Sequence, residues 1–81
     1  MKVIYKINRG YNLTVGKKYT VKEFCPQLIT RNFTFPRYVS LVEDDNGKEA
    51  TGHAYRFTTT MDGMSCEEYI KQNFQDITDY N

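Results

Sequence analysis

Hydrophobic and polar residues alternate with a period of two along much of the first sixty residues. This alternation predicts a first strand over about residues 2–8 and a second over about 18–24. Between them, Asn8-Arg9-Gly10 is typical of a turn, because glycine readily takes a positive φ. Pro26 ends the second strand, since proline lacks the backbone N–H that a sheet requires.

The stretch 27–35 alternates again and fits either a further strand or an extended loop. In a single strand, one face would carry Ile29, Arg31, Phe33 and Phe35. Pro36 ends the stretch or places it at the edge of a sheet.

A strong strand pattern over residues 38–42 leads to an Asn46-Gly47 pair. Asn-Gly between strands favours a type I′ hairpin turn, in which both residues have a positive φ. Asp45 and Lys48 would then flank the turn as an opposite-charge pair.

The returning strand is predicted over residues 48–54, and residues 55–60 fit a short helical turn followed by a last strand. A helix is predicted over about residues 65–77. Ser65 is its expected N-cap, and Glu68 three residues later completes a capping box.

The order of these elements predicts an α+β protein that is mostly β: a small twisted antiparallel sheet of about five strands with one C-terminal helix. A chain of 81 residues is short enough to form one domain, residues 1–81, around one core. The tail, residues 76–81, is expected to fray.

Charge is distributed unevenly along the chain, although the net charge is only +1. Residues 1–40 carry eight basic residues and one acidic residue, a net charge of +7. Residues 41–81 carry three basic and nine acidic residues, a net charge of −6. Two arrangements remain open: a basic face opposite an acidic one, or halves that interleave so that charges cancel across strands.

Three stretches, residues 15–21, 38–49 and 54–57, have the spacing of a known pattern. A Gly-Lys-x-Tyr-x-Val strand precedes a hairpin with an acidic Asn-Gly tip, and an x-x-Arg-Phe turn follows. The pattern resembles small SH3-like barrels, in particular short early proteins of tailed bacteriophages, and covers roughly residues 13–58.

The chain departs from this resemblance at three places: a strand at residues 2–8, an insertion around Pro26–Pro36 and a helix after Ser65. Such additions are where a family member would acquire its own binding surface. SH3-like barrels serve many unrelated binding roles. The resemblance implies an accessory protein that acts in the host cytoplasm by binding a host macromolecule.

No catalytic arrangement is recognisable, so we expect a protein that is not an enzyme. His53, Cys25 and Cys66 lack the paired spacing of a zinc site, and neither a metal nor another cofactor is expected. The chain has no long apolar run, so no signal peptide or membrane span is predicted and the default location is the cytoplasm.

Basic and aromatic residues of the first half are the candidate partner-binding residues: Lys17, Lys18, Lys22, Arg31, Phe33, Phe35, Arg37 and Tyr38. Arginine and aromatic residues are enriched at protein interfaces. The same residues can stack bases and contact phosphates. A competing interpretation places Phe33 and Phe35 in the core.

These features predict a protein-binding module that inhibits or redirects a host protein. The alternative is a single-stranded nucleic-acid-binding protein that uses the basic and aromatic β-surface. A third hypothesis is a homo-oligomer formed through an exposed strand edge such as Met1–Ile7.

Overall fold

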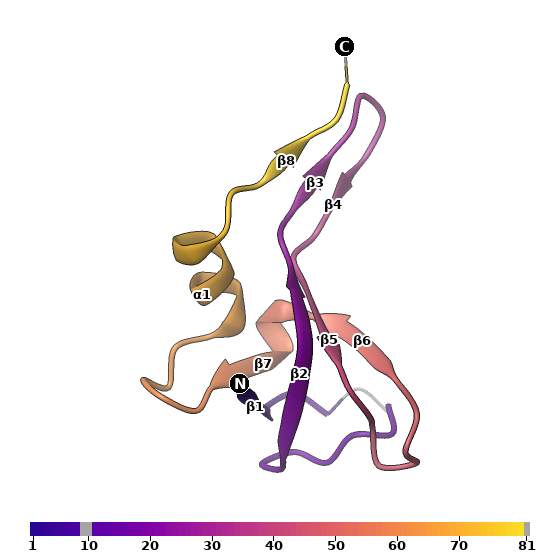
Figure 1. The fold of residues 1–81 in the computed structure, drawn as a ribbon, viewed down its shortest axis with the longest axis vertical. Helices are drawn as coiled ribbons and strands as arrows, with labels where there is room; N and C mark the ends of the chain where they lie inside the picture. Colours follow the sequence, from indigo (N-terminus) through magenta and orange to yellow (C-terminus); the bar gives the residue numbers. More distant parts are fainter. Residues whose placement is uncertain (9–10, 81) are drawn as a thin grey trace.

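The structure, a computed structural model, describes residues 1–8 and 11–80. A five-stranded antiparallel sheet has the order β6-β5-β2-β1-β7 (Figure 1). Its strands are β1 (Lys2–Tyr5), β2 (Lys18–Cys25), β5 (Tyr38–Leu41), β6 (Ala50–His53) and β7 (Phe57–Thr59). A 3-10 turn, η1 (Ala54–Arg56), separates β6 from β7. The mostly β fold with about five main strands is therefore confirmed.

Alternate residues of these strands fill the core, as the period-two pattern requires. Val3 and Tyr5 of β1 are fully buried, and so are Val39 of β5 and Phe57 of β7. The rings of Tyr5 and Phe57 lie 5.4 Å apart between centroids. Burying each such side chain contributes about 1.5–3 kcal/mol, so these contacts hold the sheet together.

The helix α1 (Cys66–Asn73) packs on this sheet through its buried residues Cys66 and Ile70. The Ser65 hydroxyl accepts a hydrogen bond of 3.2 Å from the Glu68 N–H, which confirms the predicted N-cap. The helix ends four residues earlier than the predicted limit, residue 77. Phe74 already has an extended backbone, and the chain after it forms strand β8 (Ile77–Thr78), so the helix cannot continue.

A second sheet, β4-β3-β8, extends away from the first and forms what we call the arm (Figure 1). Its strands are β3 (Leu28–Ile29), β4 (Thr34–Phe35) and β8 (Ile77–Thr78). Strands β3 and β4 form an antiparallel hairpin, while β8 pairs with β3 in parallel. The expected single strand or loop over 27–35 is thus a hairpin. The expectation that residues 76–81 fray is wrong for β8.

The connection between β5 and β6 also differs from the expected hairpin. Leu41 pairs with Ala50, so residues 42–49 form a longer loop rather than a two-residue turn. Gly47 has a φ of +76°, but none of the described non-glycine residues has a positive φ. A type I′ turn at Asn46-Gly47 is therefore wrong, because that turn needs a positive φ at both residues.

The N-terminal strand does not lie at an edge of the sheet. Strand β1 lies between β2 and β7, so Lys2–Tyr5 is paired on both sides and is not an open edge. Of the predicted turn Asn8-Arg9-Gly10, the last two residues lie outside the described part of the chain.

Candidate interaction surface

The register of the arm places apolar side chains from three strands on one face. Leu28 of β3 lies opposite Phe35 of β4 on one side and opposite Ile77 of β8 on the other. Residues directly opposite one another project from the same face of a sheet. Phe33 comes two residues before Phe35, and their ring centroids are 6.1 Å apart. We call these four residues the arm face.

The arm face is open to solvent. The exposed fraction is 67% for Phe33, 47% for Phe35 and 51% for Ile77. The interpretation that places both phenylalanines in the core is therefore wrong, because two-residue strands at the end of the molecule leave nothing to cover them. Exposed apolar side chains that gather in one place mark interaction surfaces more often than isolated ones do.

The turn at the tip of the arm carries Arg31. The Thr30 hydroxyl accepts a hydrogen bond of 3.0 Å from the Phe33 N–H, and the Thr30 N–H donates to the Phe33 carbonyl at 2.7 Å. These two bonds fix the turn, which brings exposed Arg31 next to the arm face. Arg31, Phe33 and Phe35 are thus the predicted residues that the structure brings together.

Arg37 and Asp76 join the base of the arm to the larger sheet. The Arg37 guanidinium donates to Asp76 Oδ2 at 2.7 Å, and the exposed fractions of the two side chains are 13% and 30%. Asp76 Oδ1 accepts a bond of 3.1 Å from the Gln27 N–H. The Arg37 carbonyl accepts from the Ala54 N–H at 2.9 Å. Arg37 therefore positions the arm.

The predicted lysines lie away from the arm, on β2 and the loop before it. Lys17 forms an ion pair of 2.8 Å with Asp45, and Lys22 forms one of 2.7 Å with Glu49. Hydrogen bonds to these carboxylates raise the pKa of both lysines. Exposed Lys18, the first residue of β2, lines a shallow hollow that Glu43 and Asp44 also line.

The ion pairs decide how the two oppositely charged halves of the sequence are arranged. Each of the three ion pairs found among the described residues joins a base from residues 1–40 to an acid from residues 41–81. The halves thus interleave, and their charges cancel at these places. This favours the second of the two arrangements left open by the sequence.

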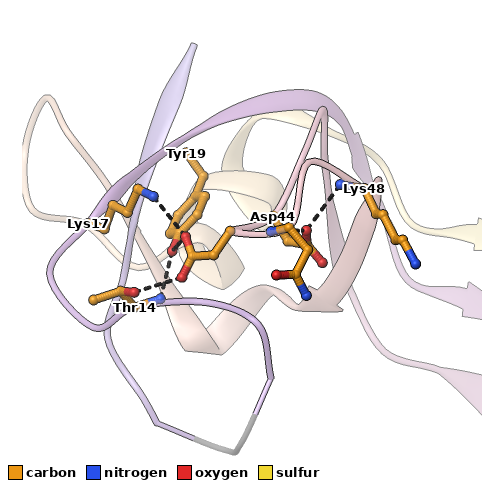
Figure 2. A network of polar contacts seen from close by, with 7 residues as sticks. Thr14, Lys17, Tyr19, Asp44 and Lys48 are labelled. Carbon is orange, nitrogen blue, oxygen red and sulfur yellow. Dashed lines mark hydrogen bonds and ion pairs between the residues drawn. The ribbon is translucent and has the colours of Figure 1, made fainter.

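Asp45 joins the loop after β5 to the chain around the start of β2, where Figure 2 shows its partners Thr14, Lys17 and Tyr19. Its carboxylate accepts hydrogen bonds from Lys17 and Tyr19, both at 2.8 Å, and from Thr14 at 2.7 Å. These donors, Lys17 first, lower the pKa of Asp45 to about 2. The predicted ion pair of Asp45 with Lys48 is therefore wrong, because the ion pair of Asp45 is with Lys17. The backbone N–H of Lys48 donates to Asp44 Oδ1 at 3.1 Å.

A row of planar groups along the larger sheet was not predicted from the sequence. The Tyr38 ring lies 4.8 Å from the His53 ring, which lies 5.6 Å from the Tyr55 ring. The Arg56 guanidinium follows, 5.5 Å from Tyr55 and 5.0 Å from Tyr11. His53, Tyr55 and Arg56 are near neighbours in sequence, whereas the pairing of β5 with β6 brings Tyr38 to His53. Tyr11 comes from the segment before β2.

Among the residues described, no group of three or more His, Cys, Asp and Glu side chains is placed to hold a metal ion. Cys25 and Cys66 are free thiols, and burial raises the pKa of Cys66 to about 12. No helix in the described part of the chain is long and apolar enough to cross a membrane.

Comparison with known proteins adds no family to this description. No model of a protein family matches the chain, and neither does any curated protein or solved structure. The arm face and the row of planar groups are therefore the observations from which a function is inferred.

Proposed function

We propose that this protein is a non-catalytic binding module that engages a partner protein through the arm face. The observation that carries the proposal is the exposure of Phe33 and Phe35 on a sheet that is itself anchored to the body by the Arg37–Asp76 ion pair. Aromatic side chains and arginine dominate the binding energy of protein interfaces. An anchored arm would also lose little conformational entropy on binding.

The origin of the arm in the sequence supports the same proposal. Strands β3 and β4 come from the insertion around Pro26–Pro36, whereas β8 comes from the addition after Ser65. Two separate departures from the SH3-like pattern thus combine into one surface.

The strand order supports the proposed relation to SH3-like barrels. The η1 turn directly precedes β7, as a closing turn in that pattern does, whereas the additional strand β1 lies between β2 and β7. On this basis we extend the proposal to a phage-type accessory protein, whose partner is a host protein that it inhibits or redirects.

Binding to single-stranded nucleic acid is the competing function, and the ion pairs weigh against it. Lys17, Lys22 and Arg37 each pair with a carboxylate, so a phosphate would have to displace an existing partner. Nucleic-acid-binding surfaces normally carry a clear excess of positive charge. The arm face itself is apolar apart from the neighbouring Arg31.

The test is affinity capture from bacterial lysate with three immobilised proteins: wild type, the double variant Phe33→Ser/Phe35→Ser and the control Met61→Ser. Met61 is 75% exposed, so the control also removes an exposed apolar side chain but leaves the arm intact. We expect wild type and control to recover the same protein in stoichiometric amount and the double variant to lose it. Recovery of that protein by all three would contradict the proposal.

A parallel titration with a fluorescent oligothymidine separates the two functions. We expect no binding at low salt. Affinity that falls steeply between low and moderate salt, as phosphate contacts require, would replace the proposed function with nucleic-acid binding.

A further inference from the structure

A hollow of about 210 Å³ lies on the larger sheet, at a different place from the arm face. It is lined by the buried residues Tyr5, Gly52 and Phe57 and by Leu13 and Ala50. The hollow is therefore walled largely by apolar groups, and its volume suits one aromatic ring or branched aliphatic chain. Small-molecule sites combine such a lining with a few polar groups.

Gly52 leaves room for the Phe57 ring beside the hollow. A Cβ atom at this position would come within 3.0 Å of Cε2 in the Phe57 ring. Such a contact would force the ring to move, and Phe57 is fully buried. The absence of a side chain at residue 52 thus allows strand β6 to pass close to the ring.

Among the described residues that line the hollow, Arg56 is the one cation. Its guanidinium carbon lies 5.0 Å from the centre of the Tyr11 ring and 5.5 Å from that of the Tyr55 ring. Its Nε donates to the Tyr55 hydroxyl at 3.4 Å. Hydrogen bonds to Tyr11 and Tyr55 raise the pKa of Arg56 above its usual value, so the side chain stays cationic.

The charge of Arg56 is not neutralised within the described part of the chain. None of the ion pairs there includes Arg56, although Lys17, Lys22 and Arg37 all have carboxylate partners. Asp44 also lines the hollow, but its Oδ1 accepts hydrogen bonds from the backbone N–H groups of Asn46 and Lys48. Arg56 therefore remains able to bind an external anion.

We propose that the hollow binds a carboxylate attached to an apolar group, with Arg56 paired to the carboxylate and the apolar group against Leu13 and Ala50. A guanidinium presents parallel N–H donors that match the two oxygens of a carboxylate. Contact with the Tyr11 and Tyr55 rings restrains the guanidinium before the ligand arrives, which lowers the entropy lost on binding. This site is separate from the proposed function of the arm face.

Two sources supply this chemistry: a free aromatic acid, or the C-terminal carboxylate of a peptide that ends in an apolar residue. The experiment is an NMR titration of the isotopically labelled protein with 3-phenylpropionate and with the peptide Gly-Gly-Phe. Each probe is compared with its own amide, which has the same shape but no charge. Binding of the acid, of the peptide or of both identifies the source.

We expect the backbone signals of Thr51, Gly52 and Arg56 to shift with at least one acid probe, and its amide to bind about tenfold more weakly, because charged hydrogen bonds are the stronger ones. Arg56→Gln should lower the affinity for the acid to that for its amide. Arg56→Lys, which keeps the charge but loses the planar donors, should give an intermediate affinity.

Lys18→Gln is the matched control, since it removes the same charge from an exposed residue that does not line the hollow. It should bind like wild type. The proposal is overturned if neither acid shifts these signals, if acid and amide bind equally, or if Lys18→Gln weakens binding as much as Arg56→Gln. Should Arg56→Gln fail to fold, the acid–amide comparison on wild type decides alone.

Discussion

Breaking the ion pair at the base of the arm should destabilise the arm and the protein together. Asp76→Asn removes the charge that faces Arg37 but keeps an oxygen that can accept from the Gln27 N–H. Arg37→Met removes the other partner and keeps much of the apolar length. In the single variant Asp76→Asn, a guanidinium whose side chain is only 13% exposed loses its counter-ion.

The magnitude follows from the burial of the pair. A hydrogen bond to a charged group contributes about 1.5–3 kcal/mol. Because the Asp76 side chain is 30% exposed, solvent screens part of the interaction. We therefore expect each single variant to lower the free energy of unfolding by the lower end of that range, about 1.5–2 kcal/mol. The loss in the double variant should be about 1 kcal/mol smaller than the sum of the two single losses.

Urea unfolding followed by circular dichroism measures all four proteins of this double-mutant cycle. Amide hydrogen exchange adds a local readout, since the Ile77 and Asp79 N–H groups donate to Gln27 and Ile29 at 2.9 and 2.8 Å. Both amides should exchange faster in Asp76→Asn. Strictly additive free energies of unfolding, together with unchanged exchange at the two amides, would refute the assigned role of the pair.

Three further predictions concern the helix, the Asp45 network and the thiols. Ser65→Ala should lower the free energy of unfolding by about 1 kcal/mol in urea titrations, because the Glu68 N–H loses its acceptor; an unchanged midpoint would contradict the cap. The pKa of Asp45 is lowered by folding to about 2, so its stabilisation is complete above its unfolded value, near 3.8, and is lost as pH falls toward 2. Asp45→Asn should flatten that decline, and an identical pH profile would count against the network. Cys66, fully buried with its pKa raised to about 12, should react with a thiol reagent only when the protein unfolds, whereas labelling of Cys66 as fast as Cys25 would argue against its burial.

Local patterns predicted the larger sheet well. Period-two alternation located β1, β2 and β5, because each has one face on the core and one toward solvent. The helix start was predicted from Ser65 and Glu68, whose capping interaction is local in sequence. The helix end was not, because it depends on the pairing of β8 with β3, which are far apart in the chain.

The candidate surface was predicted only in part for the same reason. The sequence predicted Phe33 and Phe35 as binding residues beside Arg31, and the structure keeps these three together. A single strand would have put Ile29 on their face, but the turn at Thr30–Phe33 puts Leu28 there instead. The role of Arg37 depends on Asp76, which no pattern around Arg37 reveals.

Site-specific photocrosslinking tests most directly whether the arm face performs the task of this protein. A benzophenone amino acid replaces Phe33 in one protein and Met61 in another. Met61 is the control, because it is 75% exposed and lies outside the arm. After irradiation in lysate, we expect one discrete adduct from position 33 and none of that mass from position 61. Equal adducts from both positions, or no adduct from position 33, would contradict this expectation.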